Sequence, residues 1–275
     1  MKFRYRNFAA IAFLAFASLY ADACRDRSSE NMSPDSTTVK DSPEKRGEQI
    51  VAEYLKRDAA PFRKARVRFT IKTDGEPDKV YEIDTWRKQT PEATTTLSQI
   101  IRPVEDSDLA SLTTEPAGQK TTVVTYAASR GEFRETDTNK MFFGGLTAGE
   151  LLGEWGKFNY LLIAEKDLGG RKVGEVEGKL KDGMSSVVAR MTVLFRSDNH
   201  LPAEIRLFDN NGREIRTYKV VEFKDDPTHP YAARTQVDNP VYKAKIVIEV
   251  LSQEFPSTLD DAIFTRDRLK PKNSK

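Results

Sequence analysis

Apolar and polar residues alternate with a period of two over long stretches of the chain. Val67, Phe69 and Ile71 are separated by charged or polar residues, and Met191 and Val193 repeat the pattern in the second half. Such alternation is typical of strands that bury one face and leave the other in water. Helical patterns do not recur between the strands, which argues against a doubly wound parallel sheet. The chain is therefore constrained to a mostly antiparallel β structure.

The same pattern predicts about ten strands separated by short turns. Asp74-Gly75-Glu76-Pro77, Ser197-Asp198-Asn199-His200 and Gly169-Gly170 are turn sequences, and Asn211-Gly212 is the strongest hairpin signal in the chain. The clearest strands are expected at residues 65–72, 80–88, 94–102, 121–128, 132–136, 187–196, 201–207, 215–223 and 244–250.

Two helices are expected among the strands. Ser42-Pro43 combines an N-cap residue with proline at the first helical position, and apolar residues follow at helical spacing up to Leu55. Thr147 and Glu150 have capping-box spacing ahead of a second short helix. A sheet with one apolar face needs a cover, and these helices are candidates for it.

The N-terminus has the three parts of a secretory signal peptide. Lys2, Arg4 and Arg6 precede an apolar stretch, which ends at Ala21-Asp22-Ala23, a small-x-small cleavage site. The apolar stretch is shorter than the roughly 20 residues that a membrane span needs. We therefore expect residues 1–23 to be a signal peptide and the rest of the chain to be exported.

Cys24, the single cysteine, directly follows this cleavage site. A lone cysteine cannot form an internal disulfide, and acylation, as at the first residue of bacterial lipoproteins, would explain its position; an unmodified Cys24 is the alternative. The polar residues 24–44 are expected to form a flexible tether. The chain has 44 Lys and Arg against 42 Asp and Glu. Without the leader it has 41 of each, which argues against nucleic-acid binding.

Catalytic and metal-binding signals are weak. His200 and His229 have no spaced Cys or His partner, so no metal site or cofactor is predicted. Nucleophile-elbow and phosphate-loop motifs do not occur in the sequence. The pairs Asp225-Asp226 and Asp260-Asp261 could serve acid–base catalysis only if two carboxylates faced each other in a cleft. Solvated loop charges are the simpler interpretation, and we expect the protein not to be an enzyme.

The strands and the second helix region carry much aromatic and aliphatic material. Core packing is the default interpretation of these side chains. A curved sheet, however, can enclose more space than its own side chains fill, and the remaining space then becomes a ligand cavity. An acyl chain suits such a cavity, since each buried methylene contributes about 0.8 kcal/mol.

Four stretches resemble the LolA/LolB-like superfamily of outer-membrane lipoprotein-sorting proteins. Glu48 to Ile71 has its helix followed by a strand, and Leu112 to Gly118 is similar to its loop with an inserted Glu-Pro. Thr125 to Arg134 is similar to its Tyr-x-Pro-x-x-Gly hairpin, although Ser129 replaces the proline. Met141-Phe-Phe-Gly-Gly145 with the following helix resembles its Phe-Gly segment ahead of an acidic-Leu helix.

This resemblance implies an α+β fold: a strongly curved, unclosed antiparallel β-sheet (a half-barrel) with a few helices covering its concave face. It assigns residues 45–272 to one lipid-binding domain. It also implies a periplasmic protein that binds lipid or lipoprotein acyl chains, reaches a membrane surface through lipidated Cys24, and has an envelope transporter as partner. The residues expected in the cavity are Trp86, Tyr126, Phe142, Leu151 and Trp155.

Two other functions remain open at this point. A structural or sensory envelope module would keep a filled core and bind a partner protein. A carboxylate-dependent hydrolase would need Asp260 and Asp261, or Asp225 and Asp226, to face each other in a cleft.

Overall fold

The computed structural model describes residues 41–57, 60–107, 109–117, 119–136, 138–139, 141 and 143–271. The predicted signal peptide, Cys24, the tether up to residue 40 and Phe142 lie outside the described residues.

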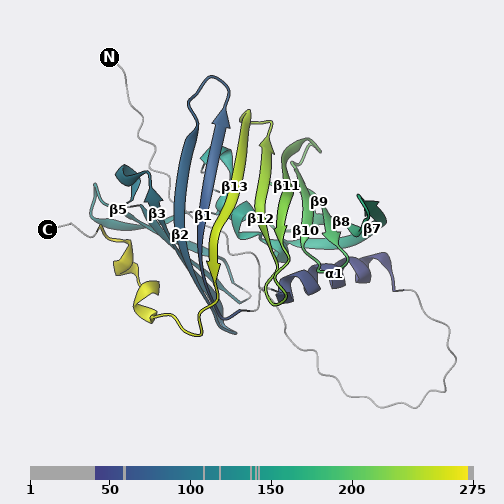
Figure 1. The fold of residues 1–275 in the computed structure, drawn as a ribbon, viewed down its shortest axis with the longest axis horizontal. Coiled ribbons are helices and arrows are strands. Elements are labelled where there is room, and N and C mark those ends of the chain that lie inside the picture. The colour runs from purple at the N-terminus through teal and green to yellow at the C-terminus, as the bar shows by residue number, and fades with distance from the viewer. Residues whose placement is uncertain are drawn as a thin grey trace, which may run out of the picture.

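A single open sheet of thirteen antiparallel strands forms the body of the described chain (Figure 1). Its first half contains β1 (Phe62–Thr73), β2 (Lys79–Gln89), β3 (Ala93–Arg102), β4 (Ala110–Pro116), β5 (Thr122–Ala127) and β6 (Glu132–Thr136). Its second half contains β7 (Phe158–Leu168), β8 (Arg171–Leu180), β9 (Arg190–Arg196), β10 (Pro202–Phe208), β11 (Glu214–Lys224), β12 (Tyr231–Asn239) and β13 (Ala244–Glu254). The predicted curved, unclosed sheet with few helices is confirmed.

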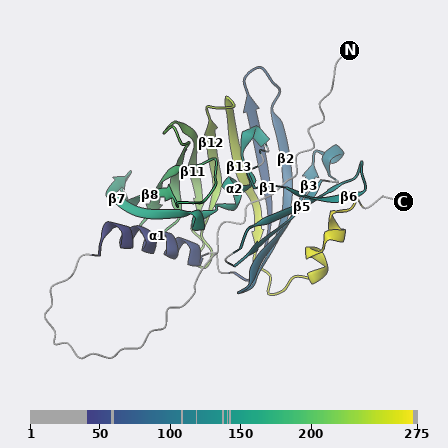
Figure 2. The same cartoon turned by 180° about the vertical axis from the view of Figure 1, so that it is seen from behind.

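The first strand, β1, lies in the middle of this sheet. The order of the strands across the sheet is β6-β5-β4-β3-β2-β1-β13-β12-β11-β10-β9-β8-β7. Strands β1 to β6 run outward to one edge, and β7 to β13 return from the other edge until β13 pairs with β1. Between β6 and β7 the chain must pass from edge to edge. The residues that do so, 137–157, are called the crossover segment, and they contain α2 (Ala148–Leu152). Figure 2 shows α2 lying in front of the middle of the sheet.

The prediction of about ten strands is wrong by several strands, because β4, β7, β8 and β12 do not show clear alternation. In β4, Ser111 and Thr113 are buried although they are polar. The interpretation of Leu112 to Gly118 as a loop is therefore wrong up to Pro116, where β4 ends. The outer part of β7 is exposed on both faces, so charged residues interrupt its pattern.

The short-range turn signals are confirmed. Asn211-Gly212 connects β10 to β11, and Gly212 has a φ of 73° there. Asp74 to Pro77 connects β1 to β2, and Gly169-Gly170 connects β7 to β8. These turns depend only on neighbouring residues, which is why local sequence predicts them.

Helix α1 (Pro43–Arg57) begins where the sequence predicts, with the Ser42 hydroxyl accepting a hydrogen bond of 3.3 Å from the Lys45 backbone N–H. Val51 and Tyr54 are buried against β7 to β9. A Cβ atom at Gly47 would lie 2.8 Å from the backbone nitrogen of Leu161, so only glycine lets the helix approach β7 this closely. The helix therefore covers one end of the sheet.

Strand register shows which residues share a face. Ala65 pairs with Thr85, whereas Lys64 pairs with Trp86, so Ala65 and Trp86 lie on opposite faces. We call the face that carries Ala65, towards α1 and α2, the inner face, and the other the outer face. Two apolar clusters lie on the inner face. The first packs α1 and Trp155 against β7 to β11 and includes Val51, Tyr54, Val193 and Phe195, and the second lies on β1 to β3, β12 and β13 and includes Val67, Phe69, Leu151 and Ile248. The third lies on the outer face of β3 to β5, where Leu269 of the C-terminal segment covers it.

Candidate functional site

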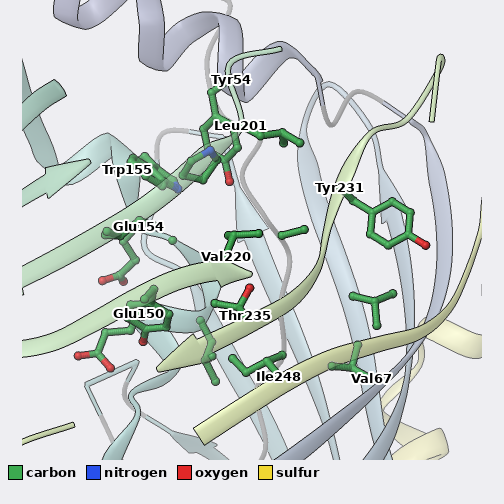
Figure 3. Close-up of a pocket in the computed structure, with 18 of the residues that line it drawn as sticks. Tyr54, Val67, Glu150, Glu154, Trp155, Leu201, Val220, Tyr231, Thr235 and Ile248 are labelled. Atoms are coloured by element: carbon green, nitrogen blue, oxygen red, sulfur yellow. The ribbon is translucent and has the colours of Figure 1, made fainter. Parts of the chain in front are cut away.

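An apolar cavity of about 190 Å³ lies between α1, the crossover segment and the inner face of the sheet (Figure 3). It is larger than the roughly 150 Å³ hollow that admits benzene, and smaller than the roughly 300–1,000 Å³ of typical ligand pockets. Its sheet wall comes from β1, β2, β7 and β9 to β13. Residues of that wall include Val67, Met191, Leu207, Val220, Thr235 and Ile248.

The crossover segment forms the opposite wall, and local capping holds it in shape. The Thr147 hydroxyl accepts a hydrogen bond from the Glu150 backbone N–H at 3.1 Å, and Glu150 Oε2 accepts one from the Thr147 backbone N–H at 2.9 Å. This is the predicted capping box, and it is confirmed. Gly153 ends α2 in a left-handed conformation, with a φ of 64°. Leu151 is thereby directed into the second cluster and the cavity wall.

Aromatic rings close the end of the cavity beneath α1. The ring of Trp155 lies 5.2 Å from that of Tyr54, nearly edge-on, and 6.0 Å from that of Phe195. The Tyr160 hydroxyl donates a hydrogen bond of 2.6 Å to the Trp155 carbonyl. In Figure 3, Trp155 and Tyr54 lie side by side at this end. Helix, crossover segment and sheet thus meet in one rigid group of rings.

A buried polar network fastens the crossover segment to the sheet. The Arg216 side chain, 3% exposed, lies with its Nε 3.7 Å from Oε2 of Glu150, which is 2% exposed. Arg216 also donates to Asn239 Oδ1 at 2.8 Å and to the Gly145 carbonyl. Asn239 Nδ2 donates to the Gly144 carbonyl at 2.5 Å. Arg216 on β11 therefore contacts both Gly145 of the crossover segment and the acid of α2, Glu150.

Burial shifts two ionisable groups at the cavity. It raises the pKa of the Glu150 carboxyl, although the positive charge of Arg216 and hydrogen bonds with Thr147 oppose the shift. Burial also raises the pKa of the Tyr218 phenol well above its usual value, and the negative charge of Glu150 adds to that shift. Tyr218 is therefore a neutral hydroxyl at physiological pH.

Three polar atoms in the walls of this cavity are buried and make no hydrogen bond within the described chain. They are Trp155 Nε1, Tyr218 Oη and Glu150 Oε1. An unsatisfied buried polar group costs about 1–3 kcal/mol, so such atoms are rare in stable proteins.

The cavity residues predicted from the sequence separate into two groups. Leu151 and Trp155 line the cavity. Trp86 and Tyr126 pack against the third cluster on the outer face, and the Tyr126 ring lies 5.2 Å from that of Phe133. The structure thus brings two of the predicted residues together at the cavity and places two elsewhere, while Phe142 and Cys24 lie outside the described residues.

Sequence reasoning missed several cavity residues. Tyr54 carried a usable signal, because it follows Val51 at helical spacing on a helix that was expected to cover the sheet. Tyr218 and Val220 lie two residues apart in the predicted strand 215–223, so their shared face was predictable. That this face is the inner one was not.

The candidate acids and His229 have structural partners. Asp260 accepts from the Ala262 backbone N–H at 2.9 Å, whereas Asp261 pairs with Lys88 at 2.5 Å. Asp225 pairs with Arg196 at 3.0 Å. The His229 ring stacks on Phe255, with 3.8 Å between centroids. Among the described residues, no three His, Cys, Asp or Glu side chains gather into a group that could hold a metal ion.

Solved structures share this architecture, and one of them is a LolA superfamily protein. A DUF1329 family protein from Desulfovibrio piger matches with a TM-score of 0.77 at 17% identity, covering 84% of this chain and 100% of that one. A putative outer-membrane lipoprotein-sorting protein domain from Vibrio parahaemolyticus matches with 0.73 at 13%, covering 82% and 99%. A LolA superfamily protein from Nitrosomonas europaea matches with 0.65 at 13%, covering 81% and 98%.

A family model described as "-like: Uncharacterized protein" matches residues 92–271, well over half of the chain. The chain belongs to that family. No curated protein matches the sequence. Within the described residues, none of the helices has both the length and the apolar character needed to cross a bilayer.

Proposed function

We propose that the protein binds the acyl chains of lipids or lipoproteins in the cavity beneath α1 and the crossover segment, without catalysis. The observation that carries this proposal is the apolar space left between the inner face and its cover, where the first and second clusters do not meet completely. A flexible hydrocarbon chain fits a narrow apolar space of this kind better than a rigid polar ligand does.

The energetics are sufficient for reversible binding. About six methylenes moved from water into the cavity would contribute about 5 kcal/mol before the cost of ordering the chain. The cavity of about 190 Å³ accommodates part of an acyl chain. Reversible holding is the behaviour expected of a carrier.

The shared fold adds support, because one of the matched structures is described as a lipoprotein-sorting domain. We therefore place the proposed role in lipid or lipoprotein trafficking in the bacterial envelope. Trp155 and Leu151 are the residues of the original prediction that we propose to contact the ligand.

Cys24 is proposed to anchor the protein to a membrane after removal of residues 1–23, with residues 24–44 as tether and 45–272 as the binding domain. Mass spectrometry of the protein from its native membrane should find an acylated N-terminal Cys24, and Cys24→Ala should release the protein into the soluble fraction. An unmodified Cys24, or cleavage at another residue, would contradict the anchor.

The binding proposal can be tested with the two tryptophans of the chain. Bromine on an acyl chain quenches an indole that it contacts. Methyl 10-bromodecanoate should therefore quench the Trp86→Phe variant, which retains Trp155 in the cavity, and leave the emission of the Trp155→Phe variant nearly unchanged. Solvent extraction of gently purified protein should also yield lipid.

Two results would remove the proposal. Absence of quenching in both variants, together with absence of extractable lipid, would leave the structural or sensory module as the remaining function, and cross-linking to a partner protein would then be the next measurement. Equal quenching in both variants would show that binding is not confined to the cavity.

A further inference from the structure

The end of the β11–β12 hairpin forms part of the cavity wall. Pro230 and Tyr231 line the cavity, and Figure 3 shows Tyr231 across it from Trp155. Pro230 also lines an open hollow of about 360 Å³, which it shares with Asp225 and with Arg196 of β9. At Pro230 a single residue therefore separates the cavity from this open hollow.

Two β-bulges lie between this hairpin end and the rest of the sheet. The register of β11 with β12 shifts twice, first at Val221 on β11 and then at Ala233 on β12. A bulge interrupts the ladder of backbone hydrogen bonds and lets the strands bend. Residues 222–232, which lie beyond both bulges, are called the flap. The bulges give the flap a place at which it can bend away from the sheet.

The flap is less firmly packed than the other covers of the cavity. None of residues 222–232 is fully buried. By contrast, α1 buries Val51 and Tyr54, and the crossover segment buries Leu146 and Leu151. Parts of a fold that bury little apolar surface open at the lowest cost. Of the flap, α1 and the crossover segment, the flap therefore opens most readily.

Side chains of β9 and of the end of β13 fasten the flap. Asp225 pairs with Arg196 at 3.0 Å, and the guanidinium carbon of Arg196 lies 4.6 Å from the centre of the Phe223 ring. The His229 ring stacks on Phe255, which follows β13. The Arg196 side chain is 5% exposed, whereas that of Asp225 is 56% exposed. A buried cation of the sheet thus holds an exposed acid of the flap.

We propose that the flap, and not α1, opens to let the ligand enter and leave the cavity, and that the ion pair of Arg196 with Asp225 sets the rate of this exchange. This rests on the proposed function and adds the route of the ligand. Entry and exit both require an open flap. A weaker fastening therefore raises both rates by the same factor and leaves the affinity nearly unchanged, because the closed form still dominates.

Stopped-flow fluorescence measures both rates. In the Trp86→Phe protein, mixing with methyl 10-bromodecanoate gives the association rate from the loss of Trp155 emission. Displacement by excess methyl decanoate gives the dissociation rate from its recovery. Asp225→Ala in this protein should raise both rates about threefold to fivefold and keep Kd within twofold. Asp225→Asn, which keeps the shape of the side chain, should have the same effect and serves if the alanine variant does not fold.

Two further variants show whether the effect belongs to the flap. Asp78→Ala is the matched control, because it breaks an exposed ion pair with Lys72 at the β1–β2 hairpin, away from the cavity, and should change neither rate. Arg46→Ala tests the competing route, since Arg46 ties α1 to Glu165 of β7. Entry beneath α1 predicts faster exchange of the ligand in Arg46→Ala, whereas entry past the flap predicts unchanged rates.

Amide hydrogen exchange locates the motion. Asp225→Ala should speed exchange in residues 222–232 and leave α1 and residues 143–157 unchanged, and bound methyl decanoate should slow exchange in the flap. Circular dichroism reports whether each variant is folded.

The outcomes separate this proposal from the proposed function. Unchanged ligand rates in folded Asp225→Ala or Asp225→Asn would overturn the flap and leave acyl binding standing. Faster rates in Arg46→Ala would also overturn it, because α1 would then be the part that moves. Absence of quenching by the brominated ester would overturn the proposed function itself.

Discussion

Apolar side chains are covered differently on the two faces of the sheet. On the outer face of β3 to β5, Leu269 inserts among Leu97, Leu112 and Val124 and is itself 1% exposed. On the inner face, α1 and the crossover segment cover more strands but leave the cavity unfilled. The outer cluster is therefore filled by its own side chains, whereas the inner region leaves a cavity, in which we propose that the ligand binds.

The reason lies in the shape of each cover. The C-terminal segment lies directly against three neighbouring strands with η4 (Asp261–Phe264) and η5 (Arg266–Leu269), whose short turns follow the surface. The crossover segment has to pass from one edge of the sheet to the other, and its short helix α2 meets the inner face through Leu151 and through the pair of Glu150 with Arg216. A curved sheet with a narrow cover leaves a gap beside that cover.

Removing the acid that holds the crossover segment should give the largest loss of stability. Glu150→Ala leaves Arg216 buried without its counter-charge, and we expect the free energy of unfolding to fall by about 3–5 kcal/mol. Urea denaturation measures it. Glu254→Ala, which breaks an exposed ion pair with Lys64, should cost less than about 1 kcal/mol. Similar values for both would mean that the buried pair does not hold the segment.

Truncating a side chain of the outer cluster should lower stability without weakening acyl-chain binding. Leu269→Ala removes a fully buried side chain, and large-to-small changes of this kind cost about 2–5 kcal/mol; we expect about 3 kcal/mol. Acyl-chain affinity should stay within twofold of wild type once the protein is folded. A strong loss of affinity in fully folded Leu269→Ala would show that the outer cluster and the cavity are coupled and do not act independently.

Filling the cavity should weaken acyl-chain binding and leave the stability nearly unchanged. Val220→Phe directs a larger side chain into the cavity, so we expect about tenfold weaker acyl-chain binding and a stability change below about 1.5 kcal/mol. Val221→Phe adds the same ring at the next residue, which is 44% exposed, and should change neither. Unaltered affinity in Val220→Phe would place the ligand elsewhere.

The smallest expected effect is a loss of stability at high pH. Burial raises the pKa of Tyr160 and of Tyr218 well above the usual value, so both keep their protons in the folded state while the unfolded chain loses them above about pH 10. The unfolded state then binds fewer protons, and stability falls as pH rises beyond 10. Denaturation between pH 9 and pH 11.5 should show a shallower fall in Tyr160→Phe; an identical slope would contradict this assignment.

Features that depend on residues close in sequence were predicted, whereas features that depend on distant residues were not. The capping box of Thr147 and Glu150 and the hairpin at Asn211-Gly212 depend on residues close in sequence, and both were predicted. Strand β4 was missed because its inner face carries buried hydroxyl groups such as Ser111 instead of apolar side chains. Trp155 and Trp86 were both expected in the cavity, and only Trp155 lies there.

Local sequence was enough for the type of structure: strands, turns, two helices and a mostly antiparallel sheet follow from period-two alternation, turn residues and capping residues. The curved, unclosed form of the sheet was expected from the family resemblance. Local sequence could not say which face of each strand is the inner one, because alternation distinguishes two faces without ranking them, and both faces of β2 and β3 bury residues. The pairing of β1 with β13, the path of the crossover segment and the space beside it arise from contacts between residues far apart in the chain. Those contacts exist only once the sheet has bent.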